Sequence, residues 1–311
     1  MEFNHISVLL EESVNALEVK PDGVYVDGTL GGGGHSSLIC SRLSDKGELI
    51  GIDRDEIALS AATERLKGYK CQKQLVHNNF FNIKEVLHNL GVDKIDGAIL
   101  DLGVSSPQLD TAERGFSYNM CAPLDMRMDR TSALDAYTVV NTYSEEELSD
   151  IIFKYGEDKL ARRIARAICK SREEKPIETT TELSEIIKSA FPPAARFADK
   201  HPAKRTFQAI RIEVNGELDG LSRAVCDFAD VLKPGGRLAI ITFHSLEDRI
   251  VKNAFADMAS GCECPKDFPV CVCGKKPSVK LINRKPIIAD KTELEENFRA
   301  HSAKLRVIEK L

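Results

Sequence analysis

A glycine-rich loop between an apolar run and a helical run decides the fold of this chain. Residues 24–38 read VYVDGTLGGGGHSSL. The β-branched and aromatic residues of Val24–Asp27 predict a strand, and a helix is expected over about 35–43. Glycines at such a junction let the backbone approach a polar or charged ligand at the helix N-terminus, although they also suit a tight structural turn. The loop lacks the Gly-Lys-Ser/Thr ending of a phosphate-binding P-loop.

An acidic residue closes the next predicted strand, Glu48–Asp53. A carboxylate placed about 20 residues beyond such a loop can accept hydrogen bonds from both hydroxyls of an adenosine ribose. The alternative role of Asp53 is to cap the helix that follows. Its position at the strand end favours the ribose role, which serves nicotinamide enzymes and methyltransferases alike.

Strands and helices alternate up to Asp101, which predicts a parallel sheet with helices on both faces. The middle of the chain then shows helical patterns without strands, and Ser144–Glu147 and Thr179–Glu182 have the residues of capping boxes. We therefore predict an α/β fold, a doubly wound, mostly parallel sheet of the class I (Rossmann-like) methyltransferase type with an inserted helical domain. The sheet domain is expected over 1–112 and 207–311, and the insertion over 113–206. Further elements are predicted as strands over 74–80, 97–101 and 238–243 and as helices over 56–66, 83–90, 159–170 and 218–232.

Two segments at strand ends indicate the chemistry. Residues 232–238 read LKPGGRL and look like the segment before the fifth strand of class I methyltransferases, which favours a methyl donor over a hydride carrier. Residues 101–110 read DLGVSSPQLD and follow the fourth strand, where open α/β sheets place their chemistry. Enzymes that methylate exocyclic amines often have Asn/Asp/Ser-Pro-Pro-aromatic here, and 105–108 matches half of that pattern.

The loop chemistry explains why such residues are needed. The amine lone pair of cytosine is delocalised into the ring, so acceptors on the amine hydrogens are required to localise it for attack on a sulfonium methyl. We predict that Asp101, Ser105, Ser106 and Pro107 do this, although a simple Ser-Pro turn is the alternative for the loop. Methylation of a ring carbon needs a cysteine nucleophile, usually in a Pro-Cys dipeptide, and the chain has none.

Several long blocks carry a specific resemblance. They read HISVLLE at 5–11, GTLGGGGH at 28–35, DLGVSSPQLD at 101–110, ERGF at 113–116, LDMRMD at 124–129, HPAKRTFQAIRIEVN at 201–215 and TFHSLEDR at 242–249. In these blocks the chain resembles the bacterial small-subunit ribosomal RNA cytosine-N4 methyltransferase family (RsmH/MraW type). The resemblance implies S-adenosylmethionine as cofactor and a cytidine near the ribosomal P site of 16S rRNA as target. It also implies cofactor contacts at Gly33, Gly34, His35, Asp53, Phe80, Asp101 and Gln108.

Charge is unevenly distributed along the chain. The net charge is −5, yet residues 159–211 carry 13 Lys or Arg against 6 Asp or Glu. We therefore expect the helical insertion to dock RNA, with a solvated helix face as the alternative. The expected contacts are Arg162, Arg163, Arg166, Lys204 and Arg205. No apolar run is long enough to span a membrane and the first residues are acidic, so a cytoplasmic protein is expected.

Four of the nine cysteines are clustered, as Cys262-Glu-Cys264 and Cys271-Val-Cys273. Four thiolates so close together can bind a structural zinc ion, although Cys-x-Cys is tighter than the usual Cys-x₂-Cys spacing. A reduced, exposed thiol loop is the alternative.

Other functions remain open at this point. They are methylation of another nucleic acid such as DNA cytosine-N4, a non-enzymatic ribosome-assembly factor that retains the cofactor fold, and, more distantly, a dehydrogenase. The sequence also leaves the oligomeric state open, a homodimer included.

Overall fold

The computed structural model describes residues 7–104, 111–196, 201–262, 264, 268, 270 and 272–311. The chain divides into two compact units. The first unit is formed by Met1–Gly103 and Leu218–Leu311, and the second by Val104–Glu217. None of the described helices is both long and apolar enough to cross a membrane.

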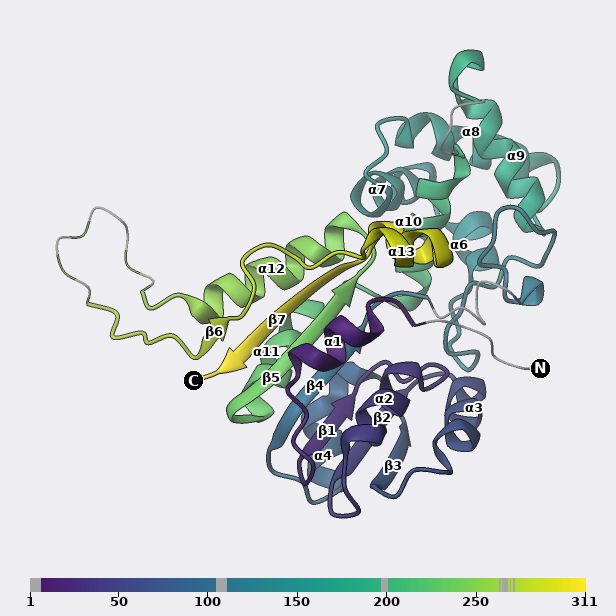
Figure 1. The fold of residues 1–311 in the computed structure, drawn as a ribbon. Helices are drawn as coiled ribbons and strands as arrows, with labels where there is room; N and C mark the ends of the chain where they lie inside the picture. Colours follow the sequence, from purple (N-terminus) through teal and green to yellow (C-terminus); the bar gives the residue numbers. More distant parts are fainter. Residues whose placement is uncertain are drawn as a thin grey trace. The chain divides into compact units, whose positions relative to one another are not determined.

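The first unit is built on a seven-stranded sheet of order β3-β2-β1-β4-β5-β7-β6 (Figure 1). The pairs among β1 to β5 are parallel, and β7 runs antiparallel to both β5 and β6. The predicted doubly wound, mostly parallel sheet is thereby confirmed. The strands are β1 (Val24–Asp27), β2 (Glu48–Asp53), β3 (Gln72–His77), β4 (Ile95–Asp101), β5 (Leu232–Thr242), β6 (Val279–Leu281) and β7 (Lys304–Lys310).

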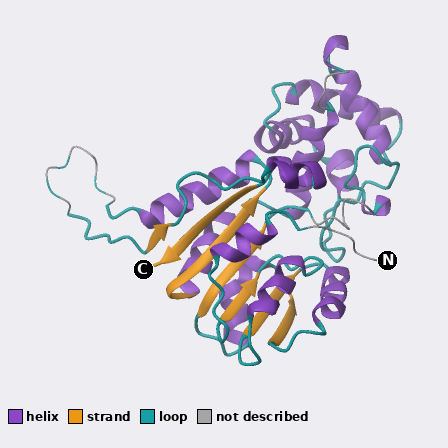
Figure 2. Ribbon diagram, viewed as in Figure 1, coloured by secondary structure: helices purple, strands orange, loops and turns teal. Residues whose placement is uncertain are grey.

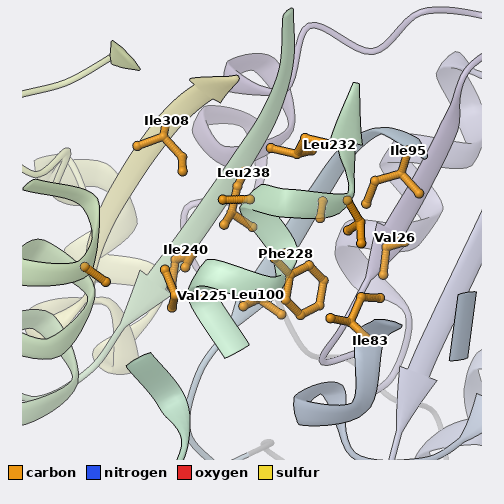
Figure 3. Close-up of a cluster of buried hydrophobic side chains, with 14 of the residues drawn as sticks. Val26, Ile83, Ile95, Leu100, Val225, Phe228, Leu232, Leu238, Ile240 and Ile308 are labelled. Carbon is orange, nitrogen blue, oxygen red and sulfur yellow. The ribbon is translucent and has the colours of Figure 1, made fainter. Parts of the chain in front are cut away.

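Helices cover both faces of this sheet, as the drawing by secondary structure shows (Figure 2). Neighbouring residues of a strand point to opposite faces, so Leu238 and Ile240 belong to one core and Ala239 and Ile241 to the other. On the first face Phe228 packs among Leu100, Val225 and Ile83 (Figure 3). The helices of this unit are α1 (Leu10–Ala16), α2 (Gly34–Arg42), α3 (Glu56–Leu66), α4 (Ile83–Asn89), α11 (Leu221–Val231), α12 (Ser245–Ala259) and α13 (Lys291–Glu296), with 3₁₀ turns η1 (Phe80–Asn82) and η4 (Phe298–Ser302).

The elements differ from the sequence prediction in three places. The third strand ends at His77, and Phe80 opens the 3₁₀ turn η1, because Asn79 caps that turn by accepting the Phe81 N–H. The turn predicted at 233–237 is a bulge within β5: Leu232 pairs with Ile95, and pairing resumes between Arg237 and Gly97. The antiparallel strands β6 and β7 were not predicted.

The second unit is helical in its described residues (Figure 2). Both predicted capping boxes are present, at Ser144 before α7 and at Thr179 before α9. Lys204 and Arg205 were expected where the chain re-enters the sheet domain. They lie instead on α10, which packs against α7, and the first unit resumes at Leu218. The elements are η2 (Ala112–Arg114), α6 (Ala136–Thr142), α7 (Glu145–Gly156), α8 (Ala161–Glu174), α9 (Thr180–Ala190), η3 (Pro193–Ala195) and α10 (Ala203–Asn215).

Candidate functional site

Three aspartates close neighbouring strands of the first unit at the same edge of the sheet. Asp27 ends β1, Asp53 ends β2 and Asp101 ends β4. The strand order reverses between β1 and β4, and open α/β sheets bind their ligands outside the carboxyl ends of the strands at such a point. The candidate site is therefore the carboxyl edge around β1.

The glycine loop lies directly over this edge. The N–H of Gly28 donates to the Ile99 carbonyl oxygen at 3.0 Å, and that of Gly31 donates to Oδ2 of Asp53 at 2.8 Å. A Cβ at Gly28 would overlap Cδ2 of the buried Leu100, so a side chain there would displace the core. The loop is thus held close against the sheet, with the acidic side chains of β1 and β2 around it.

The helix that follows the loop, α2, begins after a glycine, which has no side chain to cap its N-terminus. Its N-cap residue, Gly33, has a positive φ of 74° and makes no side-chain cap hydrogen bond. At the next position a Cβ at Gly34 would overlap Oγ of Ser7, so a side chain there would require Ser7 to move. The N–H groups at the start of a helix attract negative or electron-rich groups of a ligand.

Asp53 is held by the two segments that flank it. Its Oδ2 accepts the Gly31 N–H, and its Oδ1 accepts the Asp55 N–H at 2.9 Å. The helix cap that was the alternative role for Asp53 is supplied by Asp55, which accepts the Ile57 N–H at the start of α3. Burial raises the pKa of Asp53, and the two backbone hydrogen bonds oppose that shift. Each of its oxygens keeps a second lone pair, so the carboxylate can still accept ligand hydroxyls.

His35, at the start of α2, has its ring near Asp101 at the end of β4. Its ring is buried, with 5% of the residue exposed, and Nε2 lies 3.1 Å from the carbonyl oxygen of Val8. A carbonyl oxygen can only accept, so Nε2 carries a hydrogen and Nδ1 faces Oδ2 of Asp101 at 3.8 Å. The hydrogen bond to Val8 therefore anchors the start of α2, and the His35 ring lies beside the carboxylate of Asp101.

Within the described part of the chain, the carboxylate of Asp101 accepts fewer hydrogen bonds than those of Asp27 and Asp53. Its Oδ1 is buried and has no hydrogen-bond partner among the described residues. Burial, together with the nearby carboxylates of Asp27 and Glu247, raises the pKa of Asp101 well above its usual range. A buried acceptor without a donor costs free energy, which a ligand N–H or a cation would recover.

Sequence reasoning did not single out Asp27, His244 and Glu247 as site residues. Asp27 is buried, accepts the Ser36 hydroxyl at 2.6 Å, and has its pKa raised by burial to about 6. Glu247 is 2% exposed, and its Oε2 accepts the N–H groups of Phe243 and His244 at the turn from β5 into α12. The signal was present in the sequence, because an acid three residues beyond a cap position is a capping box, here with histidine as the cap.

The two adjacent phenylalanines of η1 have different surroundings. The Cβ of Phe80 would lie 3.3 Å from a Cβ at Gly28, whereas the ring of Phe81 lies beside Gly220 at the start of α11. Their rings contact each other edge to face, with centroids 4.6 Å apart. Phe80 is therefore the one that lies beside the glycine loop.

The remaining predicted site residues fall into three groups. Ser105, Ser106, Pro107 and Gln108 lie outside the described residues, as does Cys271. Arg162, Arg163 and Arg166 are exposed on α8, and Lys204 and Arg205 are exposed on α10. The thiols of Cys262, Cys264 and Cys273 lie together between α12 and β6.

Comparison with known proteins settles the family. The model of the MraW methylase family matches residues 2–311. The chain belongs to the MraW methylase family. It is 60% identical over 312 residues to ribosomal RNA small subunit methyltransferase H of Clostridium botulinum (strain Kyoto / Type A2), with 100% of both chains covered. Proteins of the same name from Clostridioides difficile (strain 630) and Brevibacillus brevis are 58% and 56% identical over 311 residues, covering 100% of this chain and 100% and 99% of theirs.

The family predicted from the sequence blocks is therefore confirmed, and with it the methyltransferase class of the fold. In this MraW methylase the C-terminal segment is part of the sheet unit. Arg306 on β7 is 7% exposed and donates from Nε and Nη2 to the two carboxylate oxygens of Asp248, at 2.7 and 3.2 Å. Its guanidinium thus holds β7 to α12 and is engaged within the fold.

Proposed function

We propose that this chain is a cytoplasmic S-adenosylmethionine-dependent methyltransferase of small-subunit ribosomal RNA. Its product is N4-methylcytidine in the decoding (P-site) region of 16S rRNA, formed within the small ribosomal subunit. The observation that carries the proposal is the buried, unsatisfied Oδ1 of Asp101 at the carboxyl edge of β4, beside the glycine loop. The names of the relatives support the substrate class.

The residues at this edge fit a bound methyl donor. Gly28 lets the loop lie close against the end of the sheet, the N-terminus of α2 offers backbone donors, and Asp53 offers acceptors for ribose hydroxyls. Phe80 supplies an aromatic side chain beside the loop. When bound, S-adenosylmethionine supplies an electrophilic methyl group on a positively charged sulfur. The acidic groups of Asp27, Asp101 and Glu247 lie near one another at this edge, and their ionised forms would favour a cation there.

Asp101 has the properties that amine methylation requires. Its buried Oδ1 can accept an N–H of the exocyclic amine, which localises the lone pair on nitrogen and orients it. The ionised carboxylate is the stronger acceptor, because protonation turns one of its two oxygens into a donor. The Thr29 hydroxyl accepts the Asp101 N–H at 2.6 Å and so holds the backbone of this residue in position. The loop from Ser105 to Gln108 is proposed to supply the other acceptors.

The second unit is proposed to dock the RNA. Several of the basic residues in the positively charged region are engaged within the fold: Arg172 donates to backbone carbonyls of Val140 and Tyr143, and Arg211 pairs with Glu217 at 2.8 Å. By contrast, Arg162, Arg163 and Arg166 project from α8, opposite its buried residues Ile164 and Ile168. Arg166 lies 3.4 Å from Glu145, yet 76% of its side chain is exposed. Exposed cations on one helix face suit a phosphate backbone.

The test is methylation by the purified protein with a labelled donor. The substrates are assembled small subunits from a strain lacking this enzyme, naked 16S rRNA, and cytosine-containing DNA. We expect label in the rRNA of the subunits, and N4-methylcytidine on nucleoside analysis. A ring-carbon or ribose methyl as the only product would overturn the amine mechanism, and label only in DNA would overturn the substrate. Subunit binding without transfer would identify an assembly factor.

A further inference from the structure

A cluster of thiols lies apart from the proposed methyl-transfer site, between the end of α12 at Ala259 and the start of β6 at Val279. The Sγ atoms of Cys262, Cys264 and Cys273 all lie within 4.8 Å of one another. Nothing in the methyl-transfer chemistry uses them. They come from both ends of the segment, so the chain has folded back to bring them together.

The spacing of the sulfurs matches metal ligation and not a disulfide. The Sγ atoms of Cys262 and Cys273 are 3.9 Å apart. A disulfide bond is only about 2.05 Å long. Two sulfurs bound at about 2.3 Å to one tetrahedral zinc ion lie about 3.8 Å from each other. The observed separation is therefore that of two corners of a zinc-thiolate tetrahedron.

Backbone N–H groups point at the same sulfurs. The N–H of Cys264 donates to Sγ of Cys262, and the N–H of Val272 donates to Sγ of Cys264, both at 3.3 Å. Metal ligands are commonly oriented by such hydrogen bonds from the surrounding chain. Gly274 has a φ of +63° directly after Cys273, so the chain turns sharply at this ligand in a conformation that favours glycine.

The large apolar side chains that the structure describes in this segment are exposed. Phe268, Val270 and Val272 are 50%, 69% and 73% exposed. At its base the segment is closed by the Ser278 N–H, which donates to the Met258 carbonyl oxygen at 3.0 Å. A structural metal ion is the usual source of stability for a short segment without a core.

We propose that Cys262, Cys264 and Cys273 bind one zinc ion, which holds residues 260–278 in their folded form. The sequence supplies Cys271, which lies outside the described residues, as the expected fourth thiolate. Four thiolates around a dication leave the centre negatively charged, and Lys275 and Lys276 next to Cys273 provide local compensation. With four thiolates as ligands such a site would have no open position for a substrate, so the proposed role is structural.

Elemental analysis of the full-length protein, purified without chelators in a phosphine reductant, tests the site. We expect about one zinc per chain in the wild type. The Cys262→Ser/Cys273→Ser variant should lose the zinc, whereas Cys121→Ser, which removes an exposed thiol elsewhere, should retain it. Cobalt added to the metal-free protein should give the visible absorption of tetrahedral thiolate ligation in the wild type and in Cys121→Ser only.

Two results would overturn the zinc site. One is a wild-type protein that holds no zinc and takes up neither zinc nor cobalt. The other is a protein that holds iron and labile sulfide in place of zinc. Methyl-donor affinity, measured by calorimetry, shows whether the double variant retains the folded first unit. If it does, proteolysis should become faster within 260–278 alone. Full zinc retention in Cys271→Ser would overturn the fourth ligand.

Discussion

Asp101 combines two properties that oppose each other. Burial and the carboxylates of Asp27 and Glu247 hold its pKa well above the usual range, yet its ionised form is the stronger acceptor of an amine hydrogen. The nearby positive charge of a methyl donor would favour ionisation. Donor binding and proton release at Asp101 are therefore expected to be coupled.

This coupling predicts the pH dependence of the reaction. Because the pKa of Asp101 is raised in the free protein, kcat/KM should rise with pH through that pKa and then level off. Asp101→Asn, which keeps an acceptor oxygen but cannot ionise, should flatten this limb, and Asp101→Ala should lower kcat by about 100-fold. Initial rates with labelled donor across the pH range test this. An unchanged acid limb in Asp101→Asn would assign the titration to another group, of which Asp27 is the nearest candidate.

Alanine variants of Asp53 and Asp55 distinguish an effect on donor binding from an effect on folding stability. Asp53→Ala should weaken donor binding by about 1.5–3 kcal/mol, the usual contribution of hydrogen bonds to a charged group. Asp55→Ala removes the N-cap of α3 and should cost about 1 kcal/mol of stability while donor affinity stays the same. Calorimetry and chemical denaturation measure the two quantities. Equal donor affinity in Asp53→Ala and wild type would remove Asp53 from the site.

At the scale of elements, local sequence signals predicted most of the sheet unit. Val24–Asp27 and Glu48–Asp53 are strands as predicted, because β-branched runs between glycines and acids have few alternatives. The strand Lys304–Lys310 was missed, although Leu305, Val307 and Ile308 are residues that favour strands; its antiparallel pairing with β5 is a tertiary contact that the local sequence does not specify. In the site, Asp53 and Asp101 were predicted from their strand-end positions, whereas Asp27 and Glu247 were not, although both lie in quoted motifs, because their approach to Asp101 depends on the folded sheet.

We expect the exposed arginines of helix α8 to contact the RNA backbone. Changing Arg162, Arg163 and Arg166 to Gln should weaken binding to small subunits and lower the slope of log affinity against log salt by about 1 for each phosphate that the variant no longer neutralises. Donor affinity should not change. The control is Lys67→Gln/Arg223→Gln, which removes two cations from the first unit whose side chains are 74% and 88% exposed. A wild-type salt slope in the α8 variant would leave these arginines as a solvated face.

At the scale of the whole molecule, the pair of Asp248 and Arg306 holds the last strand of the sequence to the sheet unit. The side chains are 13% and 9% exposed. Burial alone would raise the pKa of Asp248, but the hydrogen bonds from Arg306 and Lys304 outweigh it and lower the pKa. The stability this group contributes is therefore present above its unfolded pKa and is lost as pH falls through the lower, folded value.

Breaking this pair should be costly, because one buried charge is left without its partner. Asp248→Ala is expected to lower the free energy of unfolding by about 3–5 kcal/mol, and adding Arg306→Met should recover much of that loss. Denaturant unfolding at neutral pH measures both. If the two substitutions instead destabilise additively, the pair contributes no coupling and β7 is held by its apolar residues alone.

The sheet unit is formed from two stretches of chain separated by the helical unit, and protein synthesis proceeds from one to the other. When β4 leaves the ribosome, the edge that will pair with β5 has no partner, although its residues Ile95 to Leu100 are all buried in the final fold. The whole helical unit, 104–217, is made before β5 is available. An unpaired apolar strand is prone to wrong association, so nascent chains of this protein have to pass through a stage that calls for a chaperone or rapid completion of translation.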